Sequence, residues 1–71
     1  MAGTLTISIT EPDARAMRAL GYRLMWIATL DGRTLGWGHT HRREDAETEA
    51  WDLVGDLVNP DEIESIAIVE A

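Results

Sequence analysis

Hydrophobic and polar residues alternate strictly near the start of the chain, from Thr4 to Thr10. Leu5, Ile7 and Ile9 would share one side of this segment, and hydroxyl side chains would share the other. A period of two residues is typical of a strand with one buried face. The pattern therefore predicts a half-buried strand over residues 4–10.

The spacing of apolar residues changes in the next segment. Ala14, Met17 and Leu20 recur at helical intervals, Pro12 is tolerated in a first helical turn, and Gly21 is a natural C-terminal stop. The sequence therefore predicts a short helix over about residues 12–20, which would need packing to persist.

Two apolar segments, residues 22–30 and 33–40, flank the dipeptide Asp31-Gly32, which is a strong hairpin signal. A two-residue loop would place Leu30 opposite Arg33 and Trp26 opposite Trp37. A bulged loop would shift this register, so the pairing depends on the loop.

The pattern allows either face of this hairpin to pack against the rest of the molecule, because both faces of its first strand are apolar. If the face carrying Trp26 and Trp37 is outside, these residues form a possible apolar interface. If that face is core, Met25 and Ile27 are exposed instead. Either arrangement leaves apolar surface for a partner or a second copy.

The C-terminal part of the chain predicts a long helix and a last strand. Asn59-Pro60 would end the helix, and residues 63–69 alternate as a strand. The helix is expected over residues 43–58, with one apolar stripe formed by Ala46, Ala50, Leu53, Val54, Leu57 and Val58.

The order of predicted elements is strand, helix, strand, strand, helix, strand. This is the β-α-β-β-α-β order of ferredoxin-like folds. We expect a single α+β domain over residues 1–71, with an antiparallel four-stranded sheet, one long helix and one short helix. A variant in which the first helix is only a turn would give a sheet covered by a single helix.

Composition narrows the function classes. The chain has 71 residues, a formal charge of −7, six arginines with no lysine, and no cysteine. A general nucleic-acid binder needs a basic surface, and a thiolate site or disulfide needs cysteine. We therefore expect no direct nucleic-acid binding and no membrane association. With no candidate membrane span and no secretory signal at the N-terminus, a cytoplasmic location is expected.

Charge is distributed unevenly along the chain. Residues 1–43 carry a net charge of +3, and residues 44–71 carry ten acids and no base. Four of these acids recur at i, i+4, i+7 and i+11 and would form one line about 16 Å long on the long helix. The alternatives are a merely solvated face and a surface for a basic partner. The candidate partner-binding acids are Glu44, Asp45, Glu47, Glu49, Asp52, Asp56, Asp61, Glu62 and Glu64.

Catalytic and metal-binding chemistry is not indicated by any motif. His39 and His41 would share a strand face near Glu44, but a zinc site needs three or four ligands. Gly36 and Gly38 lie in a strand pattern and not between a strand and a helix, as a phosphate-binding loop would. We therefore expect no enzyme activity, no metal and no cofactor.

A family resemblance adds a concrete hypothesis. The segments Leu30-Asp31-Gly32-Arg33-Thr34-Leu35-Gly36 and Arg43-Glu44-Asp45-Ala46-Glu47-Thr48-Glu49-Ala50-Trp51 form a hairpin followed by an acidic helix. Over residues 22–58 this arrangement resembles small HicB-type antitoxins and small acidic phage anti-CRISPR proteins. The resemblance to anti-CRISPR proteins implies a DNA mimic that occupies the DNA channel of a CRISPR effector. The basic N-terminal half departs from a pure mimic, and no DNA-binding segment of the antitoxin kind is present.

Two functional hypotheses follow. The first is a non-catalytic inhibitor, a monomer or homodimer, whose acidic surface blocks the basic nucleic-acid-binding groove of a partner such as a CRISPR effector, in the host cytoplasm if the gene is phage-encoded. The second is a small assembly or antitoxin-like domain that homodimerises or docks through an apolar sheet face.

Overall fold

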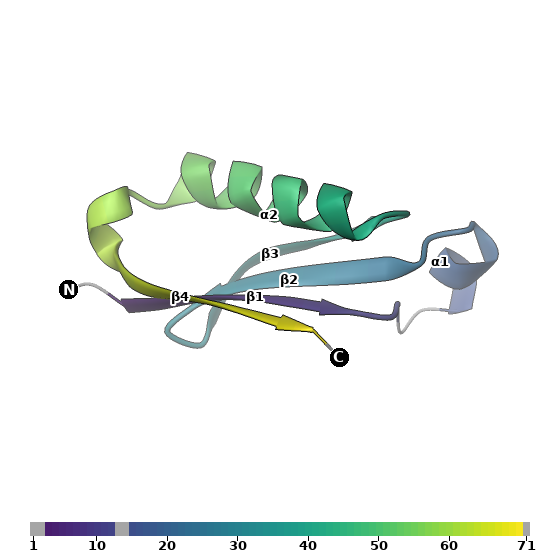
Figure 1. Ribbon diagram of the computed structural model, residues 1–71, viewed down its shortest axis with the longest axis horizontal. Helices are drawn as coiled ribbons and strands as arrows, with labels where there is room; N and C mark the ends of the chain where they lie inside the picture. Colours follow the sequence, from purple (N-terminus) through teal and green to yellow (C-terminus); the bar gives the residue numbers. More distant parts are fainter. Residues whose placement is uncertain (1–2, 13–14, 71) are drawn as a thin grey trace.

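The computed structural model describes residues 3–12 and 15–70 and contains one α+β domain. Four strands form one sheet, and a long helix lies over one of its faces (Figure 1). The elements are β1 (Gly3–Thr10), α1 (Arg15–Ala19), β2 (Leu24–Leu30), β3 (Arg33–Thr40), α2 (Arg43–Leu57), the 3-10 turn η1 (Pro60–Glu62) and β4 (Ile63–Glu70). This chain order of strands and helices agrees with the order predicted from the sequence.

The sheet is mixed, so the expectation of an antiparallel sheet is wrong. The strand order is β3-β2-β1-β4, with β1 antiparallel to β2 and parallel to β4. The cause is the small size of α1. A helix of five residues is about 7.5 Å long and cannot carry the chain back along β1. The chain therefore turns directly into β2, and β4 ends up parallel to β1 after α2 has crossed the sheet.

The connection between β1 and β2 contains α1, which lies beyond the end of the sheet and not over its face (Figure 1). None of its residues is buried. Gly21 has a φ of 94°, and the amides of Gly21 and Tyr22 donate to the carbonyls of Arg18 and Met17. This is the hydrogen-bond pattern of a glycine-terminated helix, and it confirms Gly21 as the stop. The helix was predicted from about residue 12, but Pro12 is not helical, residues 13–14 lie outside the described residues, and α1 begins at Arg15.

The Asp31-Gly32 hairpin is confirmed, but the register behind it differs from the prediction. Both loop residues have positive φ, as a two-residue type I′ turn requires. Leu30 pairs with Arg33 as expected, but farther from the loop a bulge interrupts the ladder between Thr29 and Ala28. Beyond the bulge the register is moved by one residue, so Trp26 pairs with Gly38 and Trp37 pairs with Ile27. The predicted pairing of the two tryptophans is therefore wrong, because a shift of one residue moves a side chain to the other face.

The shifted register gives the two glycines of β3 a structural role. Trp26 lies under α2 and is 4% exposed, so the face with Trp26 is the one that α2 covers. A Cβ on Gly38 would lie 2.6 Å from Nε1 of Trp26, and a Cβ on Gly36 would collide with Leu53 of α2. Glycine at both positions lets the indole and the helix approach β3 closely.

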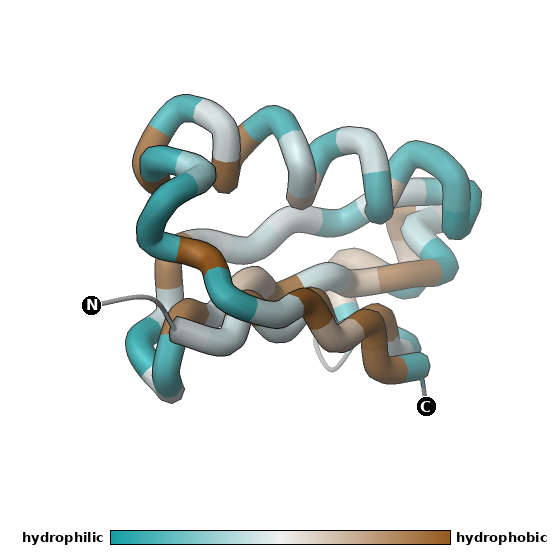
Figure 2. Tube along the Cα trace, turned by 60° about the vertical axis from the view of Figure 1, so that its left-hand side comes forward, coloured by the Kyte–Doolittle hydropathy of each residue, from teal (hydrophilic) through white to brown (hydrophobic). Residues whose placement is uncertain are grey.

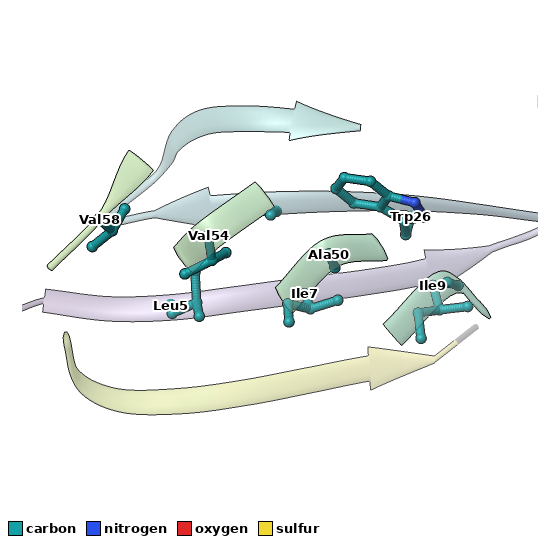
Figure 3. Close-up of a cluster of buried hydrophobic side chains, with 9 residues drawn as sticks. Leu5, Ile7, Ile9, Trp26, Ala50, Val54 and Val58 are labelled. Atoms are coloured by element: carbon teal, nitrogen blue, oxygen red, sulfur yellow. The ribbon is translucent and has the colours of Figure 1, made fainter. Parts of the chain in front are cut away.

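The core lies between α2 and the three strands β1, β2 and β3. Figure 3 shows the core side chains gathered over β1 and β2, with β4 outside the cluster. Leu57 was expected in the apolar stripe of α2, but its side chain is 56% exposed, whereas Val54 and Val58 beside it are buried. The buried residues are Leu5, Ile7, Ile9, Trp26, Ala28, Ala46, Ala50, Val54 and Val58.

Hydropathy along the backbone follows this arrangement. In Figure 2 the outer turns of α2 are mostly hydrophilic, whereas hydrophobic residues run to the C-terminal end of β4. In the part of the chain that the structure describes, no helix has both the length and the apolar character to cross a membrane.

Candidate protein-interaction surfaces

The four acids predicted to form a line on the long helix lie on one flank of α2, and all four are exposed. Two contacts place this flank on the side of β3. Leu53 lies against Gly36 of β3, and Glu49 reaches Trp26 of β2. Asp45, Asp52 and Asp56 share this side of the helix because they are spaced by three, four or seven residues from Glu49. We refer to Asp45, Glu49, Asp52 and Asp56 as the acidic line.

Glu49 differs from the other members of the acidic line. Its Oε1 accepts a hydrogen bond from Nε1 of Trp26 at 3.3 Å, in a part-buried position. An indole N–H needs a partner when the ring is buried, and Glu49 supplies it. Glu49 therefore fixes Trp26 under α2, and Asp45, Asp52 and Asp56 remain as the outward carboxylates of the line.

The remaining predicted acids divide into two groups. Glu47 contacts Arg43, and a carboxylate oxygen of Glu62 accepts a hydrogen bond from the backbone N–H of Asn59 at 3.0 Å. These two acids hold the start of α2 and the turn η1. Glu44, Asp61 and Glu64 are exposed and are not brought together with the acidic line.

Arg43 is the centre of the ion pairs found among the described residues. Its guanidinium contacts Glu47 at 2.9 Å, one helical turn away, and it also contacts Glu70 at the end of β4. The hydrogen bond with Glu70, followed by the one with Glu47, raises the pKa of Arg43 above its usual value. Arg43 thus links α2 to β4, and in the described part of the chain no ion pair neutralises Asp45, Asp52 or Asp56.

The two hairpin tryptophans lie on opposite faces. Trp26 belongs to the core, so its predicted role in an apolar interface is wrong. Trp37 is 65% exposed on the face that no helix covers, next to its cross-strand neighbour Ile27. Met25 and Ile27 on this face are half-buried.

His39 and His41 contribute to a small aromatic cluster with Tyr22. The rings of Tyr22 and His41 stack with centroids 4.7 Å apart, and Nδ1 of His41 lies 2.9 Å from the carbonyl oxygen of Gly21. Because a carbonyl oxygen only accepts, this ring nitrogen donates. The cluster joins the end of α1 to β3, and within residues 3–12 and 15–70 no group of three metal-ligating side chains is found.

Sequence reasoning missed an apolar surface beside β4. Ile66 is 51% exposed and Ile68 is 40% exposed, although they alternate in the same way as the buried residues of β1. Between α2 and β4 lies a groove with a volume of about 340 Å³, which we call the apolar groove. It is lined by Trp51, Val54, Gly55, Val58, Pro60, Ile63 and Ile66. The available signal was the small size of Ala46 and Ala50, which keeps α2 close to β1–β3.

Comparisons with protein-family models, with curated proteins and with solved structures found no match. The functional argument therefore depends on the surfaces described above.

Proposed function

We propose that this chain is a non-catalytic protein-binding inhibitor that docks its acidic surface on the basic, nucleic-acid-binding groove of a partner protein. The observation that supports this proposal is the exposed position of Asp45, Asp52 and Asp56 on one flank of the 15-residue helix α2. No cation pairs with them among the described residues. Like charges on neighbouring turns destabilise a helix, so a line of one sign is a cost that a basic partner would offset.

The proposed mechanism is competition with nucleic acid. A basic groove binds phosphates mainly through charge, and carboxylates at fixed positions can occupy the same sites. The line spans about 16 Å along α2, as calculated from the helical rise. Charge attraction would also steer the two proteins together, so association should slow as salt is added. The concrete partner suggested by the sequence resemblance is a CRISPR effector complex.

The test is binding to a panel of purified CRISPR effector complexes loaded with guide RNA, measured by biolayer interferometry at several salt concentrations. We expect binding that weakens with salt and is displaced by target DNA. Asp45→Asn, Asp52→Asn and Asp56→Asn together should weaken binding roughly tenfold or more.

A matched control separates position from total charge. Glu11→Gln, Asp61→Asn and Glu64→Gln remove the same number of charges from exposed positions off the acidic line. This control should change affinity by less than about threefold. Equal losses in the two triple variants, or no binding to any effector at low salt, would remove the acidic line as the docking surface.

A second candidate function is an assembly domain, favoured by the exposure of Trp37 on the uncovered sheet face. In that case Trp37→Ala should dissociate a homodimer seen by sedimentation velocity, with little dependence on salt. A wild-type chain that sediments as a monomer at high concentration would count against this form of assembly.

A further inference from the structure

The outer side of β4 is an open sheet edge. Among the described residues β4 pairs with β1 alone, over a register that runs from Gly3 opposite Ile63 to Ile9 opposite Glu70. Every second residue of β4 therefore directs its backbone N–H and C=O away from the sheet. Natural edge strands are usually blocked by lysine, proline or an inward charge. None of these interrupts the stretch from Ser65 to Val69.

The helix-side surface of β4 is also uncovered. Ile66 and Ile68 share the face of Leu5 and Ile7, yet α2 packs over β3, β2 and β1 and leaves these isoleucines exposed. The apolar groove adjoins them, with Ile66 as a shared residue. A strand added to the β4 edge could therefore pair its backbone and place alternate apolar side chains beside the groove.

The charged residues of this edge segment are all acidic, and Arg43 of α2 pairs with the last of them, Glu70. From Pro60 to Glu70 the chain has four acids and no base. Glu64 precedes the apolar stretch at the point where the pairing with β1 shifts register, and Glu70 follows the stretch on the helix side, opposite Ile9. An added strand would gain most if it were apolar in its middle and basic at its ends.

A second copy of this chain does not have that chemistry. In a symmetric antiparallel pair of β4 strands, a twofold axis at Ala67 places Glu64 of each copy opposite Glu70 of the other. An axis at Ile66 brings Glu70 of each copy opposite the turn η1 of the other, where Glu62 lies. Like charges directly opposite each other destabilise a strand pair. Moving the axis to Ile68 sets Ile66 against Glu70 and shortens the paired region.

We propose that the β4 edge and the apolar groove form a docking site for an extended segment of another protein, with lysine or arginine at both ends of a short alternating apolar stretch. The segment adds as a fifth strand beside β4. This site is on the opposite flank of α2 from the acidic line, so it does not depend on the function proposed above.

The experiment uses a synthetic peptide as probe, titrated into the full ¹⁵N-labelled chain. The probe is an acetylated and amidated peptide with lysine at both ends and isoleucine alternating with threonine between them. Its counterpart with glutamate at both ends tests the charge requirement. We expect amide shifts and slowed hydrogen exchange at β4 with the lysine peptide, and at least tenfold weaker binding of the glutamate peptide.

Three variants localise the binding. Ile66→Lys and Ile68→Lys change exposed side chains at the edge and should each weaken binding of the lysine peptide at least fivefold. Trp37→Lys makes the same kind of change on the opposite face and should leave the affinity unchanged. Circular dichroism checks that each variant is folded.

Glu64→Lys provides a charge reversal that does not rely on loss of binding alone. This variant should shift the preference from the lysine peptide toward the glutamate peptide. Shifts confined to the acidic line, equal affinity for the two peptides, or no binding of either would overturn the proposal. Concentration-dependent dimerisation that protects the β4 amides without any peptide would also overturn it, because the occupant would then be a second copy.

Discussion

β1 and β4 lie side by side with nearly the same apolar pattern, but they differ in burial. Leu5 pairs with Ile66 and Ile7 pairs with Ile68, and each pair points to the same side of the sheet. The residues of β1 are fully buried, whereas those of β4 are about half exposed. The difference comes from α2, which packs over β1–β3 and stops short of β4. Alternation therefore identifies the apolar face of a strand, but the position of the covering helix decides whether that face is core.

The largest expected difference between the two strands is in the cost of truncating an isoleucine. Ile7→Ala leaves a cavity under α2 and should lower the free energy of unfolding by about 2–5 kcal/mol. Ile68→Ala, at the neighbouring position in register, should lower it by less than about 1 kcal/mol, because its side chain already contacts water. Urea denaturation of both variants measures the two costs. Similar costs at the two positions would show that β4 is covered in solution.

A smaller loss of stability is expected when a side chain is added at Gly38, in the part of the sheet that α2 covers. Gly38→Ala places a Cβ 2.6 Å from Nε1 of Trp26, so the indole or β3 must move. Overpacking of this kind should lower the free energy of unfolding by about 1–3 kcal/mol. The same substitution in a Trp26→Leu background should cost less, because the rigid indole is gone. Equal costs in the two backgrounds would exclude the clash as the cause.

Beside the apolar groove, a substitution of glycine by alanine should raise stability instead of lowering it. Gly55 lies within α2 at the rim of the apolar groove, and a Cβ there meets no atom within 4 Å. Gly55→Ala should raise the free energy of unfolding by about 0.5–1 kcal/mol, because alanine loses less backbone entropy in a helix. Thermal denaturation compared with Gly38→Ala tests this prediction. A decrease in stability would mean that the groove is closed near Gly55.

Local patterns in the sequence predicted the secondary structure well. The strand over residues 4–10, the Asp31-Gly32 loop and the long helix are observed with bounds that differ by one residue or less. Each of these depends on periodicity or on turn chemistry between neighbours. The position of the short helix stop at Gly21 was also correct, for the same reason.

Features that depend on distant contacts were predicted less well. The bulge before Gly36 places Trp37 on the sheet face opposite α2. Nothing in the local sequence distinguishes a bulged hairpin from a regular one at this point. The direction of β4 follows from the small length of α1, which has five residues. The spacing of apolar residues had predicted a longer helix. The acidic line was correctly placed on one flank of α2, but the bond from Glu49 to Trp26 depends on the shifted register.

The smallest expected effect concerns the ion pair between Arg43 at the start of α2 and Glu70 at the end of β4, which joins the helix to the exposed edge strand. Both side chains are about half exposed, so Arg43→Gln should leave the fold and the midpoint of thermal unfolding nearly unchanged. It should speed hydrogen exchange at the C-terminal end of β4, because the edge strand then loses a contact with the helix. Arg42→Gln is the matched control, since Arg42 is exposed beside Arg43 and forms no ion pair among the described residues. High salt should reproduce the effect in the wild-type chain. Equal exchange in the two variants would show that β4 is held by its pairing with β1 alone.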